Sequence, residues 1–277
     1  NAVTLVADVA STPDSTGSGG NFKNIGGGTI STGVGGAWLV YSGTPVSGAT
    51  NLNGLVAAAK RYNVDNGSDP LASGDRIYYR IQPTLTLTAD NKSKTYAAPN
   101  PTFTFSDSGL IDGDSLASAL SSGPSYAVDG TLSTSLNLTA GTPHNIIPSA
   151  ATATDLGYTI AYSNGSLTVN PLALAGAAIA AGNSVYAASL TPGAVSFTNI
   201  VGADVVGTTA SVDVSATSTS GNYIVGSYTQ TAGAISGTDA ANYSFAGFTS
   251  AANYDITQKA LAGAAIAAGN SVYAASL

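Results

Sequence analysis

Three aspartates in the segment SDSGLIDGD are the strongest candidates for a metal site in this sequence. Several Asp oxygens, together with backbone carbonyls, can bind Ca²⁺. The group lacks the closing glutamate of an EF-hand loop, and Asp114 is also placed to cap a following helical turn. Two interpretations therefore stay open, a Ca²⁺ site formed by Asp107, Asp112 and Asp114 and a structural role for Asp114.

The sequence contains no constellation of residues that is typical of catalysis. His144 is the only histidine, and it lies between two prolines in TPHNIIP, where we expect a loop residue without a chemical role. A zinc site would need further His or Cys ligands. Nucleophile-elbow and phosphate-loop motifs are absent, and no pair of acids suits glycoside hydrolysis. We therefore expect a protein that is not an enzyme and has no cofactor beyond the possible Ca²⁺.

A strip of basic and aromatic residues is the one candidate for ligand binding. It comprises Arg76, Tyr78, Tyr79 and Arg80, within the stretch from Lys60 to Lys94 that holds most of the basic residues. Tyrosine rings beside cations can stack on a sugar ring. The alternative, which we favour, is a solvated face whose aliphatic stems cover a joint between two parts of the chain.

The charge composition argues against several kinds of partner. Charged residues make up 8% of the 277 residues, against about 25% in an average soluble protein. All fifteen acids are Asp, and no Lys or Arg occurs between Lys94 and Lys259. Nucleic acids and anionic membranes require a basic surface, so we expect neither as a partner. The net charge of −7 helps to keep the chain soluble.

The absence of both Cys and Met rules out disulfides and thiolate chemistry. Export from the cell is favoured, because neither oxidisable sulfur is present to be damaged outside it. No apolar run approaches the roughly 20 residues of a membrane helix, so direct membrane insertion is not expected.

An exact internal repeat organises the sequence. ALAGAAIAAGNSVYAASL occupies Ala173–Leu190 and returns unchanged at Ala260–Leu277, an offset of 87 residues (260 − 173). Recurrence at a fixed spacing is the signature of a repeat array. We therefore expect 173–259 to be one repeat unit and 260–277 to be the truncated start of the next, with frayed strand edges and with further repeats beyond it.

The first 83 residues contain short bursts of β-forming residues between Gly, Ser, Asn and Asp clusters, which predict short strands. Residues 1–45 suit the end of a right-handed parallel β-helix, closed by a cap of Trp38, Leu39 and Tyr41; an ordinary sheet with an aromatic cluster is the alternative. In the connecting segment 46–83, LNGLVAAAKRY (Leu52–Tyr62) predicts a short helix.

Residues 84–172 form the first complete module. TLTLT and TFTF alternate with period two, so each predicts a strand with one buried face. DSLASALSS predicts a helical turn capped by Asp114. TLSTSLNLT (Thr131–Thr139) predicts a further strand, and Asn164-Gly165 between two alternating runs predicts a tight hairpin.

Several of these segments resemble known families. GGAWLVYSGTP (Gly35–Pro45) resembles the segment that closes the β-helix of filamentous-haemagglutinin-like proteins exported by two-partner secretion. Residues 84–172 resemble MBG-type repeats of large bacterial adhesins, through Lys94-Thr95-Tyr96, Gly113-Asp114-Ser115 and the closing Gly157–Val169 stretch. Residues 173–259 resemble the related YDG-type repeats.

The resemblance of residues 173–259 to YDG-type repeats is carried by Ser184-Val185-Tyr186, Gly202–Val206, Gly221-Asn222-Tyr223 and Ala241–Phe245. The family motif after the tyrosine, Tyr-Gly or Tyr-Asp-Gly, reads Tyr96-Ala97-Ala98 in one module and Tyr186-Ala187-Ala188 in the other. The name-giving turn is therefore altered, while the rest of the frame is kept.

Together these observations predict an all-β protein. The C-terminal end of a β-helix would be followed by tandem small β-sandwich-like modules, with a β-grasp-like arrangement as the alternative. The resemblance implies the non-catalytic stalk of a surface or secreted adhesin of a Gram-negative bacterium, extracellular or attached to the outer membrane. Its partners would be neighbouring repeats, other copies of the chain or extracellular polysaccharide. The alternative function is a carbohydrate-binding module that contacts matrix or host glycans.

Overall fold

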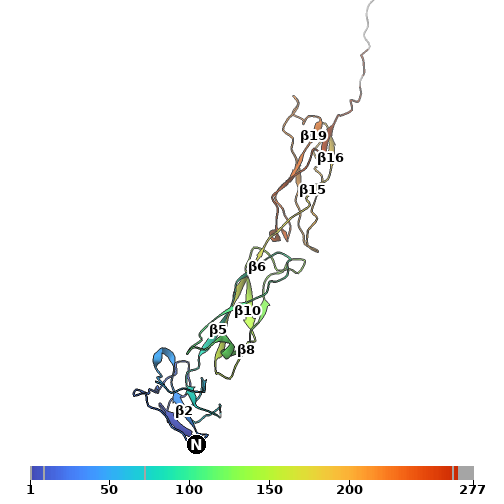
Figure 1. The fold of residues 1–277 in the computed structure, drawn as a ribbon. Coiled ribbons are helices and arrows are strands. Elements are labelled where there is room, and N and C mark those ends of the chain that lie inside the picture. The colour runs from blue at the N-terminus through green and yellow to red at the C-terminus, as the bar shows by residue number, and fades with distance from the viewer. Residues whose placement is uncertain (1, 9, 72, 264, 268–277) are drawn as a thin grey trace, which may run out of the picture. The chain divides into compact units, whose positions relative to one another are not determined.

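The computed structural model describes residues 2–8, 10–71, 73–263 and 265–267, and it is all-β (Figure 1). The chain forms two compact units. The first comprises residues 1–131 and 141–170, and the second comprises 132–140 and 171–277. A nine-residue piece from within the first module thus belongs to the second unit, and the chain crosses between the units after residues 131, 140 and 170.

The N-terminal part of the first unit is a four-stranded sheet of order β1-β2-β4-β3. Its strands are β1 (Ala2–Val6), β2 (Ala37–Ser42), β3 (Ala59–Arg61) and β4 (Arg76–Tyr79), and every pairing is parallel. The sheet therefore shares its parallel pairing with a β-helix, but β4 lies between β2 and β3, so the strands do not stack in chain order.

The segment expected to cap this sheet lies inside it. β2 is flanked by β1 and β4, and its residues Trp38, Leu39 and Tyr41 are at most 5% exposed. Their side chains alternate between the two faces of the strand, because successive residues of a strand point to opposite sides. Trp38 packs in the main core, and Leu39 and Tyr41 pack with Tyr78 and Val64 on the other face.

The helix predicted for Leu52–Tyr62 is not formed. Asn53 and Gly54 adopt positive φ (39° and 94°), which makes a turn, and Ala59–Arg61 is strand β3. A helical turn precedes this segment, the 3₁₀ helix η1 (Val46–Gly48). The alanine-rich composition favours a helix locally, but pairing of β3 with β4 decides the conformation.

The first module contains two sheets, of order β12-β5-β7 and β6-β13-β10-β9, and the pair β11-β8. In β5, Leu85, Leu87 and Ala89 are buried, and the threonines between them are half-buried. The elements are β5 (Thr84–Ala89), β6 (Lys92–Thr95), β7 (Phe105–Ser108), α1 (Leu116–Ala119), β8 (Leu120–Ser122), β9 (Ser125–Val128), β10 (His144–Ser149), β11 (Thr152–Ala153), β12 (Thr159–Ser163) and β13 (Gly165–Asn170).

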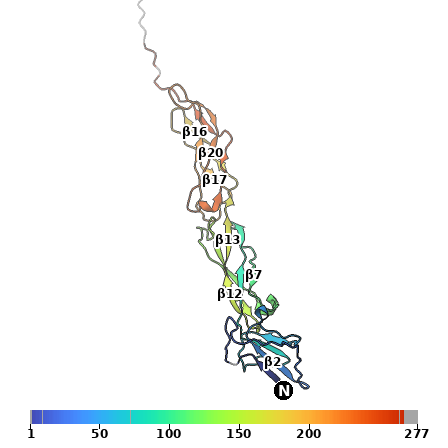
Figure 2. The same cartoon turned by 90° about the vertical axis from the view of Figure 1, so that its left-hand side faces the viewer.

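The predicted hairpin at Asn164-Gly165 is wrong. β12 pairs in parallel with β5, and β13 pairs in parallel with β6, so the chain passes from one sheet to the other without turning back (Figure 2). Neither Asn164 nor Gly165 has positive φ. Glycine is required at 165 for another reason: a Cβ there would lie 2.4 Å from the Ala89 carbonyl oxygen.

One core joins the N-terminal sheet to the first module within the first unit. Trp38, Val40, Ile77 and Tyr79 of the sheet pack in the same buried cluster as Leu85 and Leu87 of β5. α1 contributes the buried Ala119 to this cluster, and its Leu116 packs against it. With four residues, α1 is too short to be the helix of a β-grasp arrangement.

The second unit is built from short strands in four small sheets: β14-β21, β15-β17, β16-β23-β19 and β18-β20-β22. Tyr254 and Ile256 of β23 form its best-defined core together with Val212. The elements are β14 (Leu172–Ala173), β15 (Ala178–Ile179), β16 (Gly182–Val185), β17 (Val195–Ser196), β18 (Ala210–Val212), β19 (Gly226–Tyr228), β20 (Gln230–Ala232), η2 (Ala240–Asn242), β21 (Tyr243–Ser244), β22 (Phe248–Thr249) and β23 (Tyr254–Thr257).

The copy of the repeat at 260–277 is only partly covered, because residues 264 and 268–277 lie outside the described residues, and the described ones form no strand. The expectation of frayed strand edges there falls mainly on residues that are not described. Among the described residues, no helix is long and apolar enough to cross a membrane.

Candidate functional site

The structure corrects the expected exposure of the basic and aromatic strip. Arg76, Tyr78, Tyr79 and Arg80 are all buried, with exposures of 4%, 0%, 4% and 0%. Arg80 donates to four backbone carbonyls, at 2.7–3.1 Å. It thereby supplies hydrogen-bond donors to carbonyl groups of the N-terminal loops, as buried polar groups require.

The other cation of the strip is also structural. Arg76 Nη2 lies 2.7 Å from Asp69 Oδ2, and the Tyr78 hydroxyl donates to the other oxygen of Asp69. The ring of Tyr79 stacks on that of Tyr62, with 5.6 Å between the two ring centroids. Burial raises the pKa of Tyr78 to about 12, with the Asp69 carboxylate adding to the shift. A sugar ring cannot reach the faces of these tyrosines unless the sheet opens.

The three candidate calcium ligands are not brought together. Asp107 lies on β7, where it pairs with Leu87 and is exposed. Asp112 and Asp114 converge on the ammonium group of Lys60, at 2.9 and 2.8 Å. Among the described residues, no three His, Cys, Asp or Glu side chains group in a way that could hold a metal ion. The position between Asp112 and Asp114 is filled by the Lys60 cation.

His144 lies at the start of β10, not in a loop, and is 3% exposed. The backbone of Gly130 lies against its ring, since a Cβ on Gly130 would fall 1.9 Å from Nδ1.

Asp114 is the centre of a polar cluster in the first unit, which we call the first latch: Lys60, Tyr62, Asp112, Asp114 and Tyr158. The hydroxyls of Tyr62 and Tyr158 donate to Asp114 Oδ2 at 2.7 and 2.9 Å. Tyr158 also accepts from the Ile111 N–H at 3.0 Å. The first latch therefore fastens the N-terminal part, through Lys60 and Tyr62, to the module that carries Asp114.

Protonation in the first latch follows from burial and ion pairing. Burial raises the pKa of Tyr158 to about 12, and the Asp114 carboxylate adds to the shift. Burial, followed by the hydrogen bond to Asp114, also raises the pKa of Tyr62. Burial opposes the charge of Lys60, but its hydrogen bonds to Asp114 and Asp112 outweigh this and raise the pKa of Lys60. Both tyrosines thus remain neutral donors at physiological pH.

The cap predicted at Asp114 is provided by its neighbour. Ser115 is the N-cap of α1 and forms a reciprocal capping box with Ser118. Asp114 is free of that role and only 5% of its side chain is exposed.

An open groove of about 670 Å³ runs beside the first latch. The polar side chains of Lys60, Asp112 and Asp114 and the apolar side chains of Leu55, Val56 and Ile77 are among those that line it. The groove is large enough for a small ligand. Its charged groups, however, are already paired with one another, because Lys60 forms ion pairs with both Asp112 and Asp114.

A second cluster of the same kind lies in the second unit, and we call it the second latch: Asp204, Asp239, Asn242 and Tyr243. These four side chains are 2–8% exposed. The Tyr243 hydroxyl donates to Asp204 Oδ2 at 2.7 Å and accepts from the Val201 N–H at 2.9 Å. This repeats the arrangement of Asp114, Tyr158 and Ile111 in the first unit.

The second latch holds the segment 132–140. The N–H groups of Thr134 and Ser135 donate to Asp239 Oδ1 and Asp204 Oδ1 at 3.1 and 3.0 Å. The Ala140 N–H donates to Asn242 Oδ1 at 2.7 Å. Hydrogen bonds of backbone N–H groups to buried carboxylates are stronger than neutral ones.

The hydroxyl of Ser135 completes this contact. It donates to the Val201 carbonyl at 2.7 Å and accepts from the Ala203 N–H at 2.8 Å. A Cβ on Gly202 would lie 2.8 Å from Ser135 Oγ, so glycine allows this approach. Hydrogen bonds from the N–H groups of Val205 and then Thr134 hold the pKa of Asp239 below its ordinary value, so Asp239 is ionised and accepts.

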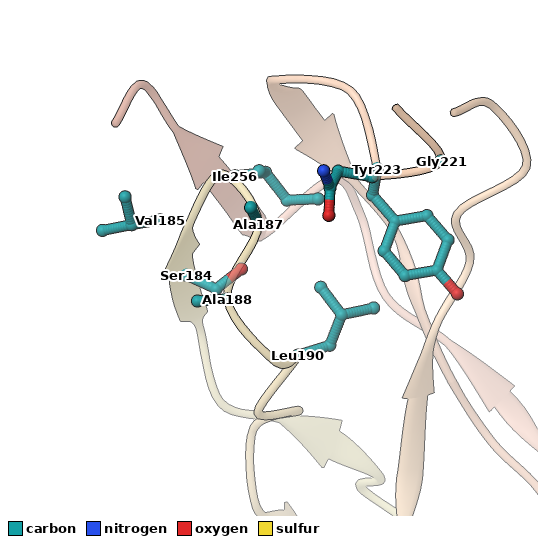
Figure 3. Close-up of a pocket in the computed structure, with 9 residues that line it drawn as sticks. Ser184, Val185, Ala187, Ala188, Leu190, Gly221, Tyr223 and Ile256 are labelled. Atoms are coloured by element: carbon teal, nitrogen blue, oxygen red, sulfur yellow. The ribbon is translucent and has the colours of Figure 1, made fainter. Parts of the chain in front are cut away.

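A third feature is a small cavity beside the loop 216–224 (Figure 3). Its volume is about 120 Å³, and Leu190, Gly221, Tyr223 and Ile256 are among the residues that line it. This is below the usual range of 300–1,000 Å³ for ligand pockets. We therefore assign it no small-molecule ligand.

Residues 85–168 match the family described as MBG domain (YGX type). No curated protein and no solved structure matches the chain significantly. The first module is thus similar to MBG domains, which supports a repeat module of the adhesin-like kind.

The turns after Tyr96 and Tyr186 share an unusual backbone conformation. Ala97 follows Tyr96 with φ = 62°, and Ala187 follows Tyr186 with φ = 64°. The left-handed region is favourable for glycine and unfavourable for alanine. Both Tyr-Ala turns therefore have a backbone that glycine would adopt at lower cost.

The sequence contained partial signs of both latches. Gly113-Asp114-Ser115, Gly202–Val206 and Ala241–Phe245 were recognised as parts of the repeat frame, but no pattern showed that Asp and Tyr from distant positions share a hydrogen bond. Thr131–Thr139 was predicted to be a strand; in the structure it is mainly a loop bound by the second latch. The sequence does repeat Ser-Thr-Ser-x-Asn at 133–137 and 218–222, which could have marked this loop as a recurring element.

Proposed function

We propose that this chain is a non-catalytic spacer region of a large extracellular bacterial surface protein, in which MBG-like modules hold a distal part away from the cell. The observation that carries this proposal is the second latch. Residues 132–140 come from the sequence of the first module but are bound by side chains of the next repeat unit. The segment 132–140 is therefore tied to the next repeat unit by hydrogen bonds as well as by the chain, which suits a spacer built from linked modules.

The exact recurrence of Ala173–Leu190 supports the same proposal. A spacer gains length by repeating one unit, and each unit in an array contacts mainly its neighbours. Export by two-partner secretion from a Gram-negative bacterium, and attachment to its surface, remain part of the proposal. They are supported by the resemblance of Gly35–Pro45 and by the lack of Cys and Met.

A glycan-binding experiment tests this proposal against carbohydrate binding. The purified chain, shown to be folded by circular dichroism, is applied to a glycan array and to matrix polysaccharide of the producing cells. A spacer shows no saturable binding. Saturable binding that persists at moderate salt would overturn the proposal in favour of the carbohydrate-binding alternative, for which the burial of Tyr78 and Tyr79 gives no support.

A second experiment measures spacing directly. The chain is inserted between a bacterial surface anchor and a short epitope tag, and antibody access to the tag is compared with that of an anchor without the insert. The proposal predicts greater access with the insert. Equal access would show that the chain does not act as a spacer.

A further inference from the structure

The loop of residues 216–224 has the same backbone structure as the loop that the second latch holds. In the bound loop, Ser133 N–H donates to the Asn137 carbonyl at 2.8 Å and Leu136 N–H donates to the Ser133 carbonyl at 2.9 Å. In the other loop, the same two bonds join Ser218 to Asn222 and Gly221 to Ser218, both at 2.8 Å.

The dihedral angles and bridges of the two loops agree as well. Leu136 has φ = 60°, and Gly221, at the matching position, has φ = 79°. Each loop is closed by an isolated antiparallel bridge, Leu132 with Leu138 and Thr217 with Tyr223. The sequences are Ser-Thr-Ser-Leu-Asn and Ser-Thr-Ser-Gly-Asn. The loops are therefore two copies of one element, which we call the plug.

The two plugs differ in what binds them. In the first plug, the N–H groups of Thr134, Ser135 and Ala140 are bound by Asp239, Asp204 and Asn242. The matching N–H groups of the second plug belong to Thr219, Ser220 and Val225. Among the residues that the structure describes, these three N–H groups have no hydrogen-bond partner.

The exposure of the plugs follows the same pattern. Ala140, at the end of the first plug, is 6% exposed, whereas Val225, its counterpart, is 41% exposed. Tyr223 and Ile224 beside it are 41% and 42% exposed. Three neighbouring apolar side chains at this exposure form a surface that a partner can cover.

The side chain of Tyr186 holds the second plug in the conformation that it shares with the first plug. The Tyr186 hydroxyl lies 2.7 Å from Ser218 Oγ and 3.0 Å from Ser220 Oγ. These contacts hold the turn through its side-chain hydroxyls and do not use its N–H groups. A preorganised loop loses less conformational entropy on binding than a flexible one.

We infer that the second plug binds the latch of a further copy of the 173–259 repeat, through carboxylates and an amide equivalent to Asp204, Asp239 and Asn242. The repeat that recurs from Ala260 identifies this partner, because its first eighteen residues are identical to those of the repeat that carries the second latch. A unit with a plug at one site and a latch at another associates head to tail, which gives an open array. The inference rests on the proposed function and names the partner of its repeat units.

Extension of the chain tests the inference. A second copy of residues 191–259 is added after Leu277, which completes the repeat that starts at Ala260. Hydrogen exchange at Thr219, Ser220 and Val225 is compared in the 277-residue chain and in the extended chain. Hydrogen bonds to charged groups contribute about 1.5–3 kcal/mol, so exchange at Thr219 and Ser220 should slow by about 10- to 100-fold. The acceptor of Val225 would be a neutral amide, so its exchange should slow by about 2- to 10-fold. Thr134, Ser135 and Ala140 serve as internal controls, because they are bound in both chains.

A matched variant carries Ala in place of the two aspartates of the added copy that correspond to Asp204 and Asp239, because Asn would keep an oxygen that can accept. Slow exchange should then be lost at Thr219 and Ser220 and kept at the first plug. Unchanged exchange at Thr219, Ser220 and Val225 in the extended chain would overturn the inference.

A second measurement does not depend on the added copy. In the 277-residue chain, residues 132–140 are replaced by a Gly-Ser linker, which leaves the second latch open. Head-to-tail binding predicts concentration-dependent association in sedimentation, abolished by Ser220→Pro; a monomer at all concentrations would contradict the inference. A failure of the spacer function would instead appear as glycan binding or unchanged tag access, with the exchange results unaffected.

Discussion

Replacing Ala97 by glycine is expected to stabilise the first unit. Ala97 has φ = 62° in the turn after Tyr96, where the Ala98 N–H donates to the Thr95 carbonyl at 3.0 Å. A residue with a Cβ costs about 1–2 kcal/mol in the left-handed region. Glycine removes this cost but adds about 0.4–1 kcal/mol of unfolded-state entropy. The net gain in the free energy of unfolding is therefore about 0.5–1 kcal/mol.

The single tryptophan makes this measurable in the first unit alone. Trp38 is buried in the core that the N-terminal sheet shares with β5, so its fluorescence reports on the unfolding of that unit. For a unit of this size, the gain corresponds to a rise in Tm of about 1–4 °C. Urea titration followed at Trp38 gives the free energy directly.

Ala98→Gly is the matched control, because it changes the same residue type in the same turn at a position without positive φ. It should destabilise the unit by about 0.5–1 kcal/mol through the unfolded-state entropy of glycine. Equal destabilisation by Ala97→Gly and Ala98→Gly would refute the reasoning, since it would show that the left-handed geometry at Ala97 carries no cost.

Three further predictions concern the latches and the crossing between sheets. Lys60→Ala leaves the Asp114 carboxylate, whose side chain is 5% exposed, without its cation. We expect the free energy of unfolding, from urea titration followed at Trp38, to fall by about 1–3 kcal/mol, and by less in Lys60→Arg. An unchanged free energy of unfolding would contradict the role of Lys60. Asp239 has a pKa below its ordinary value of 3.8 in the folded chain, so its contribution to stability is present above pH 3.8 and is lost as the pH falls below that value. Between pH 5 and pH 3 the second unit, followed by tyrosine circular dichroism, should therefore lose less stability in Asp239→Asn than in the unmodified chain. Equal pH dependence of the two chains would be evidence against this. Gly165→Ala brings a Cβ to 2.4 Å from the Ala89 carbonyl oxygen and should lower the free energy of unfolding by about 1–3 kcal/mol. Gly113→Ser, at a position with φ = 72° and no atom within 4 Å of the added Cβ, should lower it by about 1–2 kcal/mol through backbone strain alone. A Gly165→Ala variant as stable as the unmodified chain would exclude the close approach.

Patterns that depend on neighbouring residues could be predicted from the sequence. The alternation in TLTLT correctly places Leu85 and Leu87 inward on β5, because side chains alternate along any strand. The helical turn after Asp114 is also present, although Ser115 is its cap. The all-β class follows from many such short runs.

Features that depend on pairing between distant segments could not be predicted. Asn164-Gly165 matches a hairpin turn locally, but parallel pairing of β12 with β5 and of β13 with β6 keeps the chain straight there. Leu52–Tyr62 has helical composition, yet β3 gains more from pairing with β4. The burial of Arg80 is of the same kind, because the carbonyl groups that it binds come from residues 60–73 positions earlier.

The separation of plug and latch along the chain has a consequence for how such genes change. The latch residues Asp204, Asp239 and Asn242 lie in one repeat, and the segment that they bind lies in the preceding module. If the gene recombines unequally between the identical stretches Ala173–Leu190 and Ala260–Leu277, whole 87-residue units are added or removed. Each such event leaves every latch preceded by a Ser-Thr-Ser plug, so the number of repeats can vary between strains without a compensating mutation at any junction.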